Sequence, residues 1–365
     1  MRVVIPCHNE PDLLGTLEAL HACDPPKHPV EVLIVLNDSE QHAGTDVRQQ
    51  NLKTLEAFET WERQNQKNTQ LKFYVIHALN LPHKTAGVGL ARKIGMDEAL
   101  RRFIAADTDG SIICLDADCR VSPNYLTAIE EEFQASAYGL GTVDFTHRKE
   151  DGDALALRQG IDYYERFLHY YVNGLSYAGF PYAIQTIGSC MLVKASVYAK
   201  HGGMNKRKAG EDFYFLHKII PHEKHIEMQS AKVYPSCRVS DRVPFGTGKA
   251  QEKWLKQSHQ HFYTYDPEVF KALKRLLSVS LLFYEKPFKQ VIEHLPLWVQ
   301  NFLEEAQAET KIAALIKNST TAQQFHKQFF VWFDGFMCLK FVHFARDNAF
   351  PNVTIAEAEQ RLAAF

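Results

Sequence analysis

The stretch "IICLDADCRV" (residues 112–121) joins an apolar run to two aspartates, Asp116 and Asp118, that are separated by one residue. In an extended chain, side chains two residues apart point to the same side, so these carboxylates repel each other unless a positive charge lies between them. Either a cation or only water lies between the two carboxylates. The stretch therefore predicts a buried strand at 112–115 that ends in a pair of acidic side chains.

Three earlier segments share this apolar, β-branched character: residues 3–5, 32–36 and 73–76. Such runs are typical of parallel strands that are buried on both faces. Between them, apolar residues recur at helical spacing, at 13–20 behind Pro11 and again at 96–103. This alternation of strands and helices predicts an α/β fold in which helices flank a parallel sheet. The polar, glycine-containing segment 40–51 predicts a loop.

Polar residues follow three of the predicted strands: Cys7 to Glu10, Asn37 to Ser39, and Asp116 to Asp118. Any one cluster could simply mark the end of a strand. Because ligands collect at the carboxyl ends of parallel strands, the joint occurrence of three clusters predicts a binding site at one edge of the sheet.

A second acidic pair, Glu211 and Asp212, opens a helically spaced segment that follows a short predicted strand at 189–193 and a Gly202-Gly203 turn. Acidic residues stabilise the start of a helix, so capping is an alternative role for this pair. Beyond residue 251 the pattern is mostly helical.

Composition narrows the class of protein. The chain has 365 residues, 45% hydrophobic and 23% charged, with a formal net charge of -2, and it contains no long run of like charges. A nucleic-acid-binding protein is therefore not expected. The seven cysteines are odd in number, which favours reduced thiols in the cytoplasm. Since neither a signal peptide nor an apolar run of about 18 residues is recognised, we expect a cytoplasmic protein, with peripheral contact to the inner face of a membrane as an option.

Five segments, in this order, resemble the nucleotide-sugar glycosyltransferases of the GT-A fold, family 2, which are inverting enzymes: "VVIPCHNE" (3–10), "IVLNDS" (34–39), "GVGLARKIGMDEAL" (87–100), "ICLDADC" (113–119) and "GSCMLVKASVYAKHGGMNKRKAGEDF" (188–213). The resemblance covers roughly residues 1–245. It implies a Rossmann-like, mixed and mainly parallel sheet flanked by helices, with a helical C-terminal extension. We expect a catalytic domain at 1–250, with a nucleotide-binding half at 1–120 and an acceptor-side half at 121–250, and a helical region at 251–365 that packs on it.

The resemblance also implies roles for the acidic residues. Asp118 would ligate a divalent metal, Mn or Mg, and Asp116 would contact the ribose or a metal-bound water. Hard oxygen ligands suit these ions, which stabilise a diphosphate leaving group as Lewis acids. Asp212 would be the general base that takes the proton of the acceptor hydroxyl, and Glu211 would orient the acceptor or the loop.

For the nucleotide, the resemblance implies a pocket lined by Pro6, Asn9 and Glu10, with Asp38 hydrogen-bonded to the base. Gly89 would allow close approach of the nucleotide, and Arg92 would lie near the base or the phosphates. This chain departs from the usual pattern in two places: "NDS" at 37–39 stands in for a more acidic turn, and Lys93 stands where Asn is common.

Three other segments have more than one interpretation each. Arg238, Arg242 and Lys249 lie in a basic, glycine-containing segment, 234–254, that could cover a diphosphate, although surface arginines are often only solvated. The aromatic segment 160–182 could stack on an acceptor sugar, but its spacing favours a buried helix. The apolar segment 329–344 could contact a membrane, but its low content of basic residues favours a core helix or a dimer surface, and we prefer packing against the catalytic domain.

The sequence therefore predicts a metal-dependent enzyme that transfers one sugar from a nucleotide-sugar donor to the hydroxyl of a sugar, a lipid-linked or a small-molecule acceptor. A homodimer is an option. One alternative is a sugar nucleotidyltransferase, which usually carries a Gly-rich, Arg-containing loop after the first strand that "PCHNEPDLLG" lacks. The other is a non-catalytic nucleotide-binding scaffold of the same fold, which would be expected to lose its carboxylates.

Overall fold

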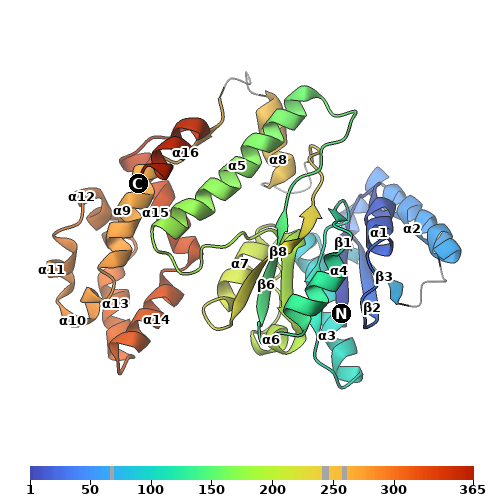
Figure 1. Ribbon diagram of the computed structural model, residues 1–365, viewed down its shortest axis with the longest axis horizontal. Helices are drawn as coiled ribbons and strands as arrows, with labels where there is room; N and C mark the ends of the chain where they lie inside the picture. The colour runs from blue at the N-terminus through green and yellow to red at the C-terminus, as the bar shows by residue number, and fades with distance from the viewer. Residues whose placement is uncertain (66–69, 241–245, 257–260) are drawn as a thin grey trace. The chain divides into compact units, whose positions relative to one another are not determined.

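The computed structural model (Figure 1) describes residues 1–65, 70–240, 246–256 and 261–365. Its residues form two compact units. We call Met1–Arg158 with Thr186–Glu252 the sheet unit, and Gln159–Gln185 with Lys253–Phe365 the helical unit. Residues 159–185, which we expected in the acceptor-side half, thus group with the C-terminal helices.

Within the described residues, the sheet unit holds an eight-stranded sheet in the order β3-β2-β1-β4-β7-β6-β8-β5. Its strands are β1 (Arg2–Cys7), β2 (Val30–Ser39), β3 (Leu71–Leu81), β4 (Ser111–Cys114), β5 (Arg120–Val121), β6 (Leu140–Phe145), β7 (Met191–Lys194) and β8 (His225–Tyr234). The four strands β1 to β4 run parallel. Strand β7 is antiparallel to β4 and β6, β8 is parallel to β6, and β5 is antiparallel to β8. The expected mixed, mainly parallel sheet is confirmed.

The helices of the sheet unit follow the predicted alternation. They are α1 (Leu13–His21), α2 (Asp46–Asn65), α3 (Val88–Ala105), α4 (Tyr125–Ala128), α6 (Ala195–Lys200), α7 (Glu211–Ile219) and α8 (Thr247–Lys256, which ends in the helical unit), with short 3-10 helices η1 (Glu40–His42) and η3 (Gly188–Cys190) and a π-helical segment η2 (Ile129–Gln134). The loop predicted at 40–51 is wrong from Asp46 onward, where α2 begins.

Helices cover both faces of the parallel half of the sheet. Ile34 and Leu36 of β2 line a small gap with Leu13 of α1 and Phe58 of α2. Successive residues of a strand point to opposite faces, and Val35 clusters instead with Ala91 of α3. Strand β2 is accordingly buried almost throughout, whereas the edge strand β3 is half-exposed along most of its length, contrary to the expectation that all four strands are buried on both faces.

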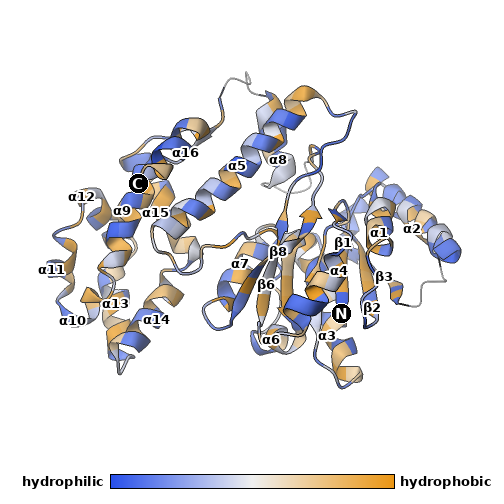
Figure 2. Ribbon diagram, in the orientation of Figure 1, coloured by the Kyte–Doolittle hydropathy of each residue, from blue (hydrophilic) through white to orange (hydrophobic). Residues whose placement is uncertain are grey.

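The helical unit contains most of α5 (Leu155–Tyr177) and a series of C-terminal helices. These are α9 (Pro267–Ser278), α10 (Leu282–Glu285), α11 (Phe288–Ile292), α12 (Leu297–Glu305), α13 (Ala308–Lys317), α14 (Ala322–Trp332), α15 (Gly335–Asn348) and α16 (Ile355–Ala363). A short antiparallel pair, β9 (Tyr263–Thr264) and β10 (Val353–Thr354), accompanies them. Several of these helices alternate hydrophobic and hydrophilic residues along their ribbons (Figure 2), as amphipathic helices around a core do.

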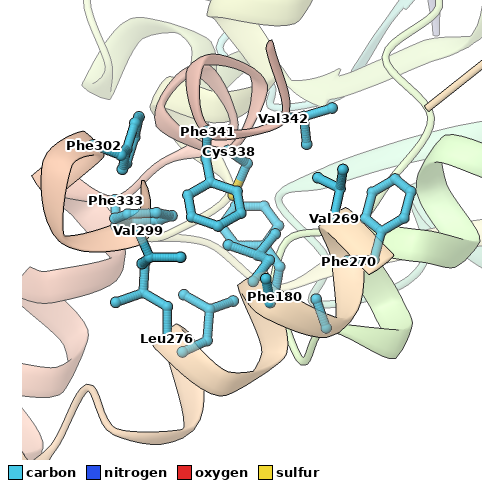
Figure 3. Packing of buried hydrophobic residues seen from close by; sticks show 14 of the residues in the cluster. Phe180, Val269, Phe270, Leu276, Val299, Phe302, Phe333, Cys338, Phe341 and Val342 are labelled. Carbon is cyan, nitrogen blue, oxygen red and sulfur yellow. The ribbon is translucent and has the colours of Figure 1, made fainter. Parts of the chain in front are cut away.

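Aromatic side chains fill the core of the helical unit. Figure 3 shows Phe270, Phe333 and Phe341 among the buried side chains of this cluster. The segment 329–344 contributes six buried residues to the same core: Phe329, Phe330, Phe333, Cys338, Phe341 and Val342. Tyr170 of α5 is buried there too, which supports the core interpretation of the aromatic segment. Among the helices that the structure describes, none combines the length and the apolarity needed to cross a membrane.

Candidate active site

The carboxyl ends of three neighbouring parallel strands meet at one edge of the sheet. Strand β1 pairs with β2 on one side and with β4 on the other. Glu10 follows β1, and Asp38 lies at the end of β2. Both residues are fully buried, and Asp116 and Asp118 follow β4. The three polar clusters predicted at the strand ends therefore lie at the same edge of the sheet.

Arg92 of α3 connects the two acidic pairs that lie far apart in the sequence. Its Nη2 atom donates to Oδ1 of Asp116 at 2.6 Å, and its Nη1 atom donates to Oε1 of Glu211. The side chain of Arg92 is 2% exposed. Burial disfavours its charge, but the carboxylates of Glu211 and Asp116 outweigh burial and raise the pKa of Arg92. A permanent buried cation therefore binds the two acidic segments together.

Two glycines allow this arrangement. A Cβ atom at Gly188 would lie 2.7 Å from both terminal nitrogens of Arg92, so only a glycine leaves room for the guanidinium. A Cβ atom at Gly89 would lie 2.1 Å from the carbonyl oxygen of Arg207 and 3.0 Å from Cβ of Glu211. Gly89 thus lets the start of α3 approach the start of α7, a role in packing that differs from the nucleotide contact we predicted for it.

Glu211 and Asp212 lie in the first turn of α7, after Gly210, whose φ of +69° is left-handed and favours glycine. Burial raises the pKa of Glu211 to about 7 although Arg92 opposes the shift, and the charge of Asp212 adds to it. Burial also raises the pKa of Asp212 above its usual range, again against Arg92. Asp212 is half-buried, and its raised pKa makes it a stronger base than an aspartate in water.

Asp118 and Glu10 share a second arginine, Arg238, which follows β8. Nη2 of Arg238 donates to Oδ2 of Asp118 at 3.2 Å and also to Oε2 of Glu10. The other carboxylate oxygen of Glu10 accepts the backbone N–H of Asp12 at 2.8 Å. The strand-end carboxylates are thus held by guanidinium groups from α3 and from the segment after β8.

The donor chemistry of Asp116 and Asp118 fits a divalent cation that is shared with a substrate. Mg²⁺ is commonly held by one or two carboxylates together with phosphate oxygens. Among the residues that the structure describes, no group of three or more His, Cys, Asp or Glu side chains could hold a metal ion alone. Asp116 and Asp118 by themselves would leave most of the coordination of such an ion to ligands from a bound molecule.

The residues predicted to bind the nucleotide are placed at the ends of β1 and β2. Pro6 is a buried residue of β1 opposite Val35. Asn9 has a left-handed φ of 49°, and its N–H donates to Oδ1 of Asn51 at 2.9 Å. Asp38 already accepts the guanidinium of Arg48 and, at 2.8 Å, the N–H of Asn80, so the structure shows it joining chain segments. Arg242 lies outside the described residues.

The sequence did not predict that α2 supports the backbone of the candidate site. Asn51 is fully buried and its Nδ2 donates to the carbonyl of Asn37 at 3.0 Å, and the hydroxyl of Thr54 donates to the carbonyl of Glu10 at 2.8 Å. The buried residues of α2 do recur at helical spacing, at Asn51, Thr54, Phe58 and Trp61, but the first two of these are polar, so the apolar pattern of the helix is weak.

The sequence model of the family described as "Glycosyl transferase family 2" matches residues 2–202, more than half of the chain. The chain belongs to this family. No curated protein matches it. Solved structures similar to this glycosyltransferase include S. aureus TarS 1-349 in complex with UDP-GlcNAc (13% identity, 87% of this chain and 90% of that chain, TM-score 0.46). Another is the mannosyltransferase PcManGT from Pyrobaculum calidifontis in complex with GDP-Man and Mn²⁺ (14% identity, 100% of this chain and 79% of that chain, TM-score 0.42).

Membership of the family gives this glycosyltransferase the GT-A fold, which agrees with the observed sheet. The segments that carried the resemblance include both acidic pairs, of which Asp116 and Asp118 lie within the matched residues, while Glu211 and Asp212 follow their end.

Proposed function

We propose that this glycosyltransferase moves a single sugar from a nucleoside-diphosphate donor to an acceptor hydroxyl with inversion, using a divalent cation. The observation that carries the proposal is the buried ion-pair bridge in which one guanidinium, that of Arg92, contacts both Asp116 and Glu211. This bridge supports a shared site for the strand-end carboxylates and the carboxylates of α7.

In the proposed reaction, Asp212 accepts the proton of the acceptor hydroxyl as that oxygen attacks the anomeric carbon, and the bond to the nucleoside diphosphate breaks. The raised pKa of Asp212 supports this role, because the group holds a proton more readily than an exposed aspartate. Glu211, fixed by Arg92, positions the start of α7.

On the donor side, Asp118 would hold the cation, with Asp116 beside it. A divalent cation bound there would supply Lewis-acid stabilisation of the departing diphosphate. Pro6, Asn9, Glu10 and Asp38 would form the wall of the nucleotide pocket, as we predict from the resemblance.

Asp212→Asn tests the general base. This change keeps the size of the side chain and removes its ability to take a proton, so we expect the transfer rate to fall by about 10²–10⁴-fold. Binding of the donor nucleotide, measured by calorimetry, should stay within a few-fold of the unmodified enzyme. Asp212→Asn enzyme with full turnover would overturn the assignment.

A further inference from the structure

Arg238 provides a positive charge at Asp118, which the proposed function assigns to the metal, and at Glu10, which it assigns to the nucleotide pocket. Its Nη2 atom contacts both Asp118 and Glu10. The Oδ2 atom of Asp118 that accepts from Arg238 is one of the oxygens available for a metal. The guanidinium and a divalent cation would therefore draw on the same carboxylate.

A counter-charge is needed here when no metal is bound. The side chain of Glu10 is 1% exposed and that of Asp118 is 19% exposed. Buried carboxylates so close to each other are costly unless a cation pairs with them. Arg238 supplies that charge from within the chain, whereas Asp116 receives its own from Arg92.

The structure also gives the side chain of Arg238 space to move. Arg238 lines a cavity of about 230 Å³ whose other walls include Asp12, Glu150 and Asp153. The side chain of Arg238 is 32% exposed, in contrast to the 2% of Arg92. Arg238 can therefore leave Asp118 without opening the core, whereas Asp12 and Glu150 on the wall of this cavity already pair with Arg148, which also lines it.

We propose that Arg238 is an exchangeable internal counter-cation, which neutralises Asp118 and Glu10 in the metal-free enzyme and yields Asp118 to the divalent cation. This inference rests on the proposed function, since it takes Asp118 as a metal ligand. It follows that the enzyme binds the cation weakly by itself, because the cation must displace Arg238.

The test is the affinity for Mn²⁺ alone, measured by calorimetry or by the electron paramagnetic resonance of free Mn²⁺, without nucleotide. In Arg238→Gln the competing charge is gone, so the Kd for Mn²⁺ should fall by about tenfold or more, the size of effect that one neighbouring charge has on proton binding to a carboxylate. Arg120→Gln is the matched control. Arg120 lies two residues after Asp118 but donates to both carboxylate oxygens of Asp12 at 2.9 Å, so its removal changes the net charge equally without freeing Asp118.

A second variant covers the case in which Arg238→Gln does not fold. Arg238→Lys keeps the charge but loses the branched guanidinium that contacts both acids, so its Kd for Mn²⁺ should fall by a few-fold. An unchanged Kd in the folded variants, or an equal change in Arg120→Gln, would overturn the proposal.

The two levels of proposal can fail separately. If the unmodified enzyme binds Mn²⁺ and nucleoside diphosphate but the Arg238 variants bind Mn²⁺ no better, only the exchange is wrong. If no variant binds Mn²⁺ even with a nucleoside diphosphate present, the metal-dependent function and the exchange are both wrong.

Discussion

At the scale of single residues, the central feature of this protein is a pair of arginines that each join acids from different segments. Arg92 joins Asp116 to Glu211 in a fully buried position, and Arg238 joins Asp118 to Glu10 in a more open one. Breaking a buried ion pair by removing one partner is strongly destabilising because the other charge stays buried. Arg92 is thus suited to hold Asp116 and Glu211 in fixed positions.

Gly188→Ala tests that fixed role without touching a charge. The added Cβ would lie 2.7 Å from the terminal nitrogens of Arg92, so the guanidinium must shift away from Asp116 or Glu211. We expect a loss of about 1–3 kcal/mol in the free energy of unfolding, as for other overpacked sites, together with reduced transfer. Gly152→Ala is the control, since no atom lies within 4 Å of its added Cβ. Equal stability of the two variants would contradict the packing argument.

His217 of α7 makes the stability of the sheet unit depend on pH. Burial lowers the pKa of His217 from 6.5 to about 4 in the folded state. The unfolded chain therefore binds the proton more readily, and the contribution of His217 to stability is full above pH 6.5 and is lost as the pH falls toward 4. Between pH 7.5 and 5 the contribution of His217 to the free energy of unfolding should fall by about 2 kcal/mol.

Unfolding by urea across this pH range, compared for the unmodified protein and His217→Gln, measures the effect. The variant should show a smaller loss of stability at pH 5. His294→Gln, at a side chain that is 80% exposed, serves as the control and should keep the full loss.

At the scale of secondary-structure elements, α2 shows where a hydropathy pattern fails. Its sequence is so polar that we predicted a loop for its first turns, yet its buried stripe includes Asn51 and Thr54. These side chains satisfy backbone groups after β1 and at the end of β2. A helix that packs partly through hydrogen bonds leaves a weak apolar signal, because polar residues occupy core positions.

In the helical unit, Asp266 links two helices and offers an element-level prediction. It caps α9 by accepting the N–H of Glu268 at 2.8 Å, and it pairs with Arg361 of α16 at 2.8 and 2.9 Å. Asp266→Ala loses the cap and the pair, so we expect a loss of about 1–2 kcal/mol in the free energy of unfolding. Asp266→Asn keeps a capping oxygen and should lose about 0.5 kcal/mol.

Chemical denaturation of the two variants distinguishes the contributions of the cap and the ion pair. If Asp266→Asn proves as unstable as Asp266→Ala, the ion pair rather than the cap dominates at this position.

At the scale of the whole molecule, ligand binding should raise the thermal unfolding temperature. A nucleoside diphosphate at about 100 times its Kd stabilises the folded state by about 2.7 kcal/mol, which corresponds to a shift of a few degrees for a chain of this size. Thermal unfolding with UDP, GDP, dTDP and CMP, each with and without Mn²⁺, measures this. A shift with one diphosphate only when Mn²⁺ is present would support the metal-dependent function, whereas no shift with any nucleotide would contradict the proposed donor class.

The sequence alone determined the strands β1 to β4, the mainly parallel order of the first half and the family, because these depend on local apolar runs and on short motifs such as "LDAD" (115–118). Only the tertiary structure revealed which charges meet. Ion pairs such as those of Arg92 and Arg238 join residues far apart in the chain, and no local pattern states their partners. The same holds for the half-exposed β3 and for residues 159–185 in the helical unit, since burial depends on what the rest of the chain places beside a segment.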